Sequence, residues 1–255
     1  MTKTNRPVDA TVIDLVGQTA DAVIAALQDW RDWGPSGSKT GQYASDLVAD
    51  AAVHDVLDPA GVGVLSEESG LVRPDADVVV VVDPLDGSTN ASRGLSWWAT
   101  SVCAVDADGP AAAVVHDLVN DHRYTAVRGG GAFRDGEPIA PSGTTRLGDA
   151  IVGISGLPPC SLGWRQFRAL GAAALDLCAV ADGRLDAYVD CSPDAHGVWD
   201  YAGALLICRE AGVTMVDALG RDLIVLDPAA RRTPVAAATV PLCDALIAAR
   251  AAAFA

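Results

Sequence analysis

The chain has 255 residues, of which 50% are hydrophobic and 20% are charged, and its formal net charge is −15. That length can bury a large core as one domain or as two closely packed halves, and the composition excludes a disordered chain. The acidic balance argues against a general nucleic-acid binder, because little in it would neutralise a phosphate backbone.

The first half predicts two helices followed by a largely antiparallel sheet. Apolar residues from Ile13 to Trp30 recur at steps of three and four, which indicates an amphipathic helix ending near Gly34. After a loop, a second helix is predicted from Ala44 to about Leu57. Short apolar or β-branched runs between turn residues, including two Asp-Gly turns, then predict strands at 63–65, 77–82, 101–107, 111–116, 124–127 and 132–133.

From about residue 148, strands and helices alternate. No repeat or low-complexity linker separates the two halves, so we expect them to share a core. We place the boundary at 147, which divides the chain into 1–147 and 148–255. In the second half the patterns predict strands at 151–154, 185–189 and 213–216 and helices at 172–181, 200–211 and 241–253.

The most informative segment follows the apolar run at 77–82. It is a turn that carries Asp83 and Asp86, with Pro84 fixing one φ angle and Gly87 permitting a sharp reversal. Such a turn can direct both carboxylates and the Leu85 carbonyl toward one point, and oxygen donors of this kind suit hard cations such as Mg²⁺. Taken alone, the motif is also compatible with an ordinary Asp-Gly turn.

Two further acidic positions strengthen the metal hypothesis. Glu67 and Glu68 also follow a strand-like run, separated from the first motif by one short loop, so we expect them in neighbouring strands. Asp200 lies at a predicted helix start, where an acidic residue is also a routine N-cap or first-turn residue. Three acidic points of this kind favour a cation site.

In this order and spacing, the three acidic points resemble the inositol monophosphatase family, which belongs to a superfamily of lithium-sensitive, metal-dependent phosphatases. The resemblance covers roughly residues 40–220 and implies an α/β fold of layered α+β type, an αβαβα sandwich. Further segments that resemble the family lie at 126–133, 168–174, 181–188 and 210–217, whereas Tyr43 stands where the family has a threonine.

The resemblance implies metal and catalytic roles. Glu67, Asp83 and the Leu85 carbonyl would bind one Mg²⁺, and Asp83, Asp86 and Asp200 a second. A third, weaker site on Glu67 would bring the total to two or three. The catalytic residues would be Glu67, Asp83 and Ser88, with Glu67 and the Ser88 hydroxyl orienting the attacking water.

The resemblance also implies a substrate side. The Gly87 and Ser88 amides would hold the phosphate, and Asp190 would bind substrate hydroxyls, although a plain loop aspartate is the alternative. Arg168 would bind an anionic group or pair with a carboxylate. The implied substrate-binding residues are Gly87, Ser88, Thr89, Gly171, Ala172, Ala173, Asp190 and Asp200.

The expected function is Mg²⁺-dependent hydrolysis of an inositol, sugar or related polyol phosphate by metal-activated water, because two cations about 4 Å apart neutralise the phosphate. The resemblance also implies a homodimer. Alternatives are a histidinol-phosphate phosphatase, a fructose-1,6-bisphosphatase, a nucleotide 3′-phosphatase, or a catalytically weak metal-binding regulatory protein. We expect the four histidines to be structural or on the surface: His54, His116, His122 and His196.

Cysteine usage and hydropathy predict the compartment. The six cysteines are scattered, without a CxxC pair or a zinc-like spacing. Residues 1–14 lack a basic flank followed by an apolar run, so no secretory signal is expected. The longest purely aliphatic run, Val78–Val82, is far shorter than the ~20 residues that span a bilayer. We therefore expect a reduced, cytoplasmic protein with no membrane or nucleic-acid partner.

Overall fold

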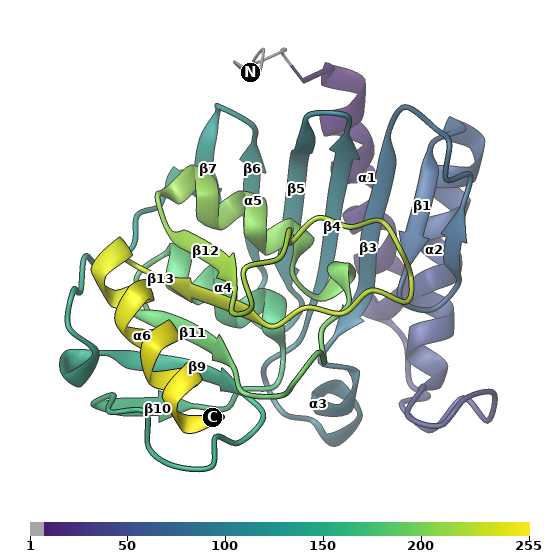
Figure 1. Cartoon of the computed structure of the whole chain (residues 1–255). Coiled ribbons are helices and arrows are strands. Elements are labelled where there is room, and N and C mark those ends of the chain that lie inside the picture. Colours follow the sequence, from purple (N-terminus) through teal and green to yellow (C-terminus); the bar gives the residue numbers. More distant parts are fainter. Residues whose placement is uncertain (1–7) are drawn as a thin grey trace.

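A pair of helices, α1 (Ala10–Gln28) and α2 (Ala44–Ala60), forms one outer layer of the computed structural model, which describes residues 8–255 (Figure 1). Helix α1 ends at Gln28, earlier than predicted, because Trp30 and Trp33 pack against the same core from a non-helical segment. By length and composition α1 could cross a membrane, but here its apolar face packs on α2 and the first sheet.

The first sheet has eight strands in the order β2-β1-β3-β4-β5-β6-β7-β8. Strands β1 and β3 pair in parallel, and the other neighbours are antiparallel, as predicted for most of this sheet. The short helix α3 (Ser88–Arg93) follows β3 directly. The strands are β1 (Gly63–Ser66), β2 (Gly70–Val72), β3 (Val79–Asp86), β4 (Ala99–Asp106), β5 (Gly109–Asp117), β6 (His122–Val127), β7 (Gly131–Arg134) and β8 (Glu137–Pro138).

The second sheet has five strands in the order β10-β9-β11-β13-β12 and belongs to the second half of the chain. The predicted boundary at 147 lies between β8 and β9, in the 3₁₀ turn η1 (Leu147–Asp149). The strands are β9 (Ile151–Ser155), β10 (Gln166–Arg168), β11 (Ala187–Asp190), β12 (Thr214–Asp217) and β13 (Pro234–Ala237), and the helices are α4 (Ala173–Ala181), α5 (Ala202–Ala211) and α6 (Val240–Ala253).

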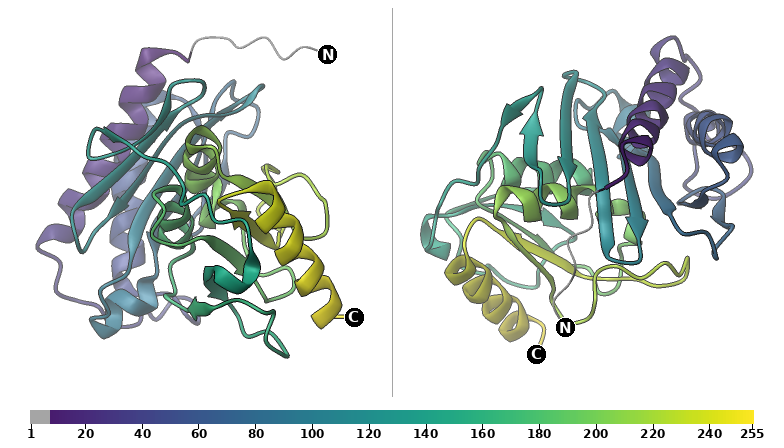
Figure 2. Two further views of the ribbon diagram at one scale, coloured as in Figure 1. Left: turned by 90° about the vertical axis from the view of Figure 1, so that its left-hand side faces the viewer. Right: turned by 90° about the horizontal axis from the view of Figure 1, so that it is seen from above.

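Alternating side chains of the two sheets build three apolar clusters, which define five layers (Figure 2). In β3, Val80 and Val82 face α1 and α2, whereas Val79 and Val81 face α4 and α5. In β11, Tyr188 faces the central helices and its neighbours face α6. The predicted layered αβαβα fold is confirmed, and the central helices of the second half cover the first sheet, so the halves share a core.

The segment around Asp200 differs from its prediction. A 3₁₀ turn, η2 (Val198–Asp200), precedes α5, which begins at Ala202 and not at 200. Helix α5 lies close against β4 and β5, and a Cβ at Gly203 would stand 2.7 Å from Ser101 Oγ and 3.2 Å from Val115 Cγ2. The glycine therefore lets the start of α5, and Asp200 with it, approach the first sheet.

Candidate active site

The parallel register of β1 and β3 brings Glu67 beside Asp83. Ser66 pairs with Val82, and the Glu67 N–H donates to the Val82 carbonyl at 3.2 Å. Because the carboxyl ends of parallel strands lie at one edge of a sheet, the residues that follow each pair leave the sheet side by side. The expectation that the two acidic clusters lie in neighbouring strands is therefore confirmed.

A β-bulge turns Asp83 and Asp86 toward the same side. Three steps along β3 would place two side chains on opposite faces of a regular strand. Here Asp83 pairs with Ser101 and Asp86 with Ala99, so β3 has one residue more than β4 between the pairs. Asp83 is 2% exposed and Asp86 is 8% exposed, and both line one cavity between the sheets.

Asp86 also caps the central helix α4. Its Oδ1 accepts the Ala173 N–H at 3.2 Å, and its Oδ2 accepts the Ala174 N–H at 2.7 Å. The first N–H groups of a helix lack partners within the helix and carry its positive dipole end, so they favour a carboxylate there. A single aspartate therefore joins the end of β3 to the substrate side of the cavity.

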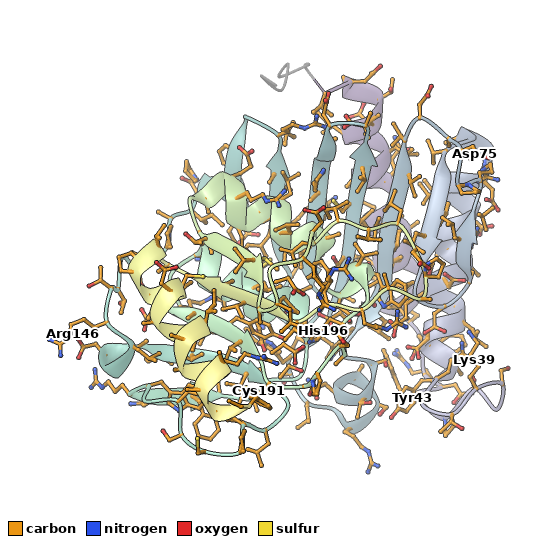
Figure 3. All side chains as sticks on the ribbon, viewed as in Figure 1. Lys39, Tyr43, Asp75, Arg146, Cys191 and His196 are labelled. Carbon is orange, nitrogen blue, oxygen red and sulfur yellow. The ribbon has the colours of Figure 1, made fainter. Side chains whose placement is uncertain are left out.

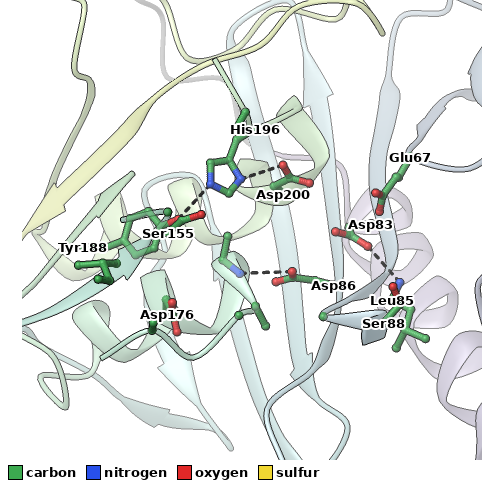
Figure 4. Close-up of a pocket in the computed structure, with 18 residues that line it drawn as sticks. Glu67, Asp83, Leu85, Asp86, Ser88, Ser155, Asp176, Tyr188, His196 and Asp200 are labelled. Carbon is green, nitrogen blue, oxygen red and sulfur yellow. Dashed lines mark hydrogen bonds and ion pairs between the residues drawn. The ribbon is translucent and has the colours of Figure 1, made fainter. Parts of the chain in front are cut away.

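Asp200 completes the acidic cluster from the other half of the chain. One ligand oxygen each from Glu67, Asp83 and Asp200 lies within 4.8 Å of the others. The Asp200 Oδ2 atom accepts N–H groups from Gly197 and from the His196 ring, both at 2.9 Å. Figure 4 shows its other oxygen turned toward Glu67 and Asp83. Carboxylates from three distant segments thus converge, as the acidic motifs predicted.

The cavity beside this cluster has a volume of about 410 Å³, enough for a small metabolite. Gly87 packs closely in one wall of the cavity. Its φ is +85°, and a Cβ there would stand 3.0 Å from the Trp97 carbonyl oxygen. Ten residues assigned a role from sequence line it: Glu67, Asp83, Leu85, Asp86, Gly87, Ser88, Gly171, Ala172, Ala173 and Asp200.

Two of the residues predicted to bind substrate, Thr89 and Asp190, do not line the cavity, and neither does Arg168. Thr89 is exposed on α3, where its Oγ1 accepts the Tyr43 hydroxyl at 3.3 Å. Asp190 is fully buried behind the wall, and its Oδ1 accepts the Ser192 N–H at 2.8 Å. Their roles toward substrate stay predictions that this geometry does not support.

Sequence reasoning missed several polar residues of the wall. His196, expected to be structural or on the surface, lies between the two sheets near the middle of the molecule (Figure 3). Tyr188 comes from β11, Ser155 from the end of β9, and Asp176 from the first turn of α4. Asp176 accepts the Trp97 indole N–H at 2.9 Å. None of these residues stands in a local motif, because the packing of the two halves brings them to the cavity.

Helix α2 supports the turn that carries Glu67. The Asp50 Oδ1 atom accepts the hydroxyls of Ser66 at 2.5 Å and of Ser69 at 3.2 Å, on either side of the glutamate pair. Lys39 donates to the Glu68 carbonyl at 2.9 Å. The turn is therefore anchored from outside the sheet, and its anchors come from a helix and a loop of the first layer.

The electrostatics of the cluster call for a cation. Withdrawal from bulk water, followed by the charges of Asp200 and other carboxylates, raises the pKa of Glu67 to about 8. Burial, followed by the charges of Glu67, Asp86 and Asp200, raises the pKa of Asp83 well above its ordinary value. Burial and the charge of Asp200 raise the pKa of Asp86 to about 7. Among the described residues that line the cavity, none is lysine or arginine. A cluster of oxygen donors with no lysine or arginine in its described wall fits a hard divalent cation.

Comparisons with known proteins agree with this site. The family model described as "Inositol monophosphatase family" matches residues 44–253. An inositol-1-monophosphatase of Mesorhizobium japonicum is 34% identical over 206 residues, covering 72% of this chain and 76% of that protein. A fructose-1,6-bisphosphatase/inositol-1-monophosphatase of Archaeoglobus fulgidus is 33% identical over 198 residues, covering 76% and 77%.

Solved structures show the same architecture. The inositol monophosphatase structure from Anabaena superposes with a TM-score of 0.80 at 25% identity and covers 95% of this chain and 96% of that chain. Fold and site together define a phosphoric monoester hydrolase. The chain belongs to the inositol monophosphatase family, as the resemblance in its acidic motifs predicted.

Proposed function

We propose that the protein hydrolyses the phosphate monoester of a small polyol or sugar with Mg²⁺ held by its acidic cluster. The convergence of Glu67, Asp83 and Asp200 within 4.8 Å carries this proposal. Asp86 and the Leu85 carbonyl would complete the donor set, because both residues line the same cavity. Two such cations, when bound, would neutralise phosphate charge, lower the pKa of bound water and stabilise the leaving alkoxide.

The chain's own residues would position the reacting groups. The turn at Gly87 and Ser88 lies beside the cluster, where its N–H groups and the Ser88 hydroxyl can donate to phosphate oxygens. Glu67 is exposed as a residue, but its carboxylate lies in the acidic cluster, where it would orient the attacking water. The organic part of the substrate would lie against Gly171, Ala172 and Ala173, whose small side chains leave it room.

The direct test is release of inorganic phosphate from a panel of inositol, sugar and polyol monophosphates. We expect turnover with Mg²⁺ and none with EDTA, restored by excess Mg²⁺. Histidinol phosphate, fructose 1,6-bisphosphate and a nucleotide 3′-phosphate in the same panel cover the alternative activities. Mg²⁺ binding without turnover of any compound would contradict the proposed function and favour a metal-binding regulatory protein.

Stability without metal should depend on pH. Glu67 and Asp86 have pKa values raised in the folded protein to about 8 and about 7, so their protonated forms stabilise the fold. This contribution is complete below their unfolded values of about 4 and is lost as pH rises through 7 to 8. In EDTA, calorimetry should show Tm falling from pH 5 to pH 8 by about 2–4 °C per kcal/mol lost. Mg²⁺ should reverse the fall at pH 8, and a Tm that rises with pH in EDTA would contradict this account.

The proposal includes a cytoplasmic homodimer that acts on small molecules. All six cysteines are free thiols, which supports a reducing compartment. The acidic net charge of −15 supports a protein without nucleic-acid partners. Light scattering coupled to size exclusion would measure the mass in solution, and a single 26.1 kDa species would contradict the dimer.

A further inference from the structure

A chain of three polar side chains leads from the second sheet to the acidic cluster. The Tyr188 hydroxyl lies 3.1 Å from the His196 Nε2 atom, and the His196 Nδ1 atom lies 2.9 Å from the Asp200 Oδ2 atom (Figure 4). Tyr188 is fully buried, and the His196 side chain is only 12% exposed. Neither residue belongs to the acidic motifs, yet both line the cavity.

The direction of the hydrogen bond to Asp200 follows from its partner. A carboxylate oxygen only accepts, so the His196 Nδ1 atom carries the proton and donates to Asp200. In the neutral imidazole the Nε2 atom accepts the Tyr188 hydroxyl, and in the imidazolium it donates to the Tyr188 oxygen, so the contact holds in either form. Burial raises the pKa of Tyr188 well above its ordinary value, so the phenol keeps its proton. Every polar atom of the ring is used inside the protein.

The contacts of Asp200 show what this arrangement does. Its Oδ2 atom is held by two donors at 2.9 Å, the Gly197 N–H and the imidazole, while its other oxygen is turned toward Glu67 and Asp83. Asp200 reaches the cluster from a 3₁₀ turn, whereas Asp83 is 2% exposed on a strand inside the core. Of these two aspartates, Asp200 depends more on side-chain contacts for its orientation.

We propose that His196, oriented by Tyr188, is a positioning residue that fixes the Asp200 carboxylate for the divalent cation. This inference rests on the proposed function only in taking Asp200 as a metal ligand. The imidazole holds one carboxylate oxygen so that the other points into the cluster, which reduces the conformational freedom lost when the cation binds. Hydrogen-bond partners of metal ligands typically change metal affinity 10–100-fold when they are removed.

The fold around His196 does not depend on the imidazole ring. The backbone of this segment is held independently of the ring, because the His196 N–H donates to the Arg232 carbonyl at 3.3 Å and the Arg232 N–H donates back at 2.9 Å. The Gly197 N–H also remains as a donor to Asp200. Loss of the imidazole should therefore leave the fold in place and release the Asp200 side chain.

Two near-isosteric substitutions distinguish the contributions of the two ring nitrogens of His196. In His196→Asn the amide Nδ2 atom takes the place of Nδ1 and can still donate to Asp200. In His196→Gln the longer amide reaches Tyr188 instead, and its Oε1 atom can accept the Tyr188 hydroxyl. His196→Ala removes both contacts, and His122→Ala serves as the control, because His122 is an exposed histidine paired with Asp135.

The readout is binding of Mg²⁺ alone, measured by calorimetry without substrate, together with Tm in EDTA. We expect His196→Ala and His196→Gln to weaken the Mg²⁺ site that includes Asp200 by about 10–100-fold. His196→Asn should stay within about threefold of the parent, and Tyr188→Phe should cause an intermediate loss. Tm in EDTA should change little in the asparagine and glutamine variants.

Three results would overturn the proposal: unchanged affinity in His196→Ala, an asparagine variant as weak as the alanine variant, or tighter Mg²⁺ binding on loss of the ring. The last would mean that the imidazole acts as a competing cation. Because Mg²⁺ binding is measured without substrate, these outcomes are distinct from failure of the proposed function, which the phosphate-release panel reports separately.

Discussion

Replacing Asp83 by asparagine is expected to abolish phosphate release while leaving the protein folded. Asp83 is 2% exposed and lies between Glu67 on one side and the bulge leading to Asp86 on the other. In the proposed site it would be a ligand of both cations, so its loss should raise the barrier by about 4 kcal/mol, which is about 10³-fold in kcat/KM.

The same variant should be more stable than the parent without metal. The neutral amide removes one of several crowded carboxylates that burial and mutual repulsion hold at raised pKa values. In EDTA at pH 8 we therefore expect a higher Tm for Asp83→Asn, and a smaller rise in Tm on addition of Mg²⁺. Asp75→Asn, in the exposed loop between β2 and β3, is the matched control (Figure 3). Near-normal turnover by Asp83→Asn would contradict the assignment of Asp83 as a metal ligand.

A second large effect is expected in the preference for substrates with one phosphate over substrates with two. Of the residues lining the cavity, five are acidic and none is lysine or arginine. Bound cations would neutralise the scissile phosphate, but the described wall offers no lysine or arginine for a second one, and its imidazole, His196, is already held by Asp200. Uncompensated like charges cost several kcal/mol, so a bisphosphate should lose at least about 100-fold in kcat/KM.

The comparison needs a matched pair of substrates. Fructose 1-phosphate and fructose 1,6-bisphosphate share the scissile ester and differ in the distal phosphate. We expect kcat/KM to favour the monophosphate, although a relative from Archaeoglobus fulgidus carries both activities in its name. Equal rates would contradict the charge argument and point to Arg168, which now donates to Phe167 and Gln166 at the exposed strand β10. Arg168→Ala would then selectively reduce turnover of the bisphosphate.

The acidic motifs could be found in the sequence because their signal is local. A buried valine run that ends in Asp83 and Asp86, with proline and glycine between and after them, indicates a turn that gathers oxygen donors. The pairing of Glu67 with Asp83 was also expected, since two strand-end acids separated by a short loop favour neighbouring strands. The structure adds the bulge that turns Asp86 to the same side.

Other features of the site have no local signal. His196 and Tyr188 look like isolated polar residues in sequence, and Asp190 matches a family position yet lies buried behind the wall. Helix α1 was predicted too long for a related reason, because Trp30 and Trp33 continue its apolar period while packing on the core from a non-helical segment.

The sequence by itself determined the order of the helices and the main strands and the acidic motifs, because periodicity and turn chemistry depend on residues close together in the chain. The resemblance carried by those motifs implied the layered fold. Only the tertiary structure decided which polar groups face the cavity and how Asp200 is held. Those contacts join segments such as β11 and η2 to the first sheet, and their geometry depends on how the two sheets pack around α4 and α5.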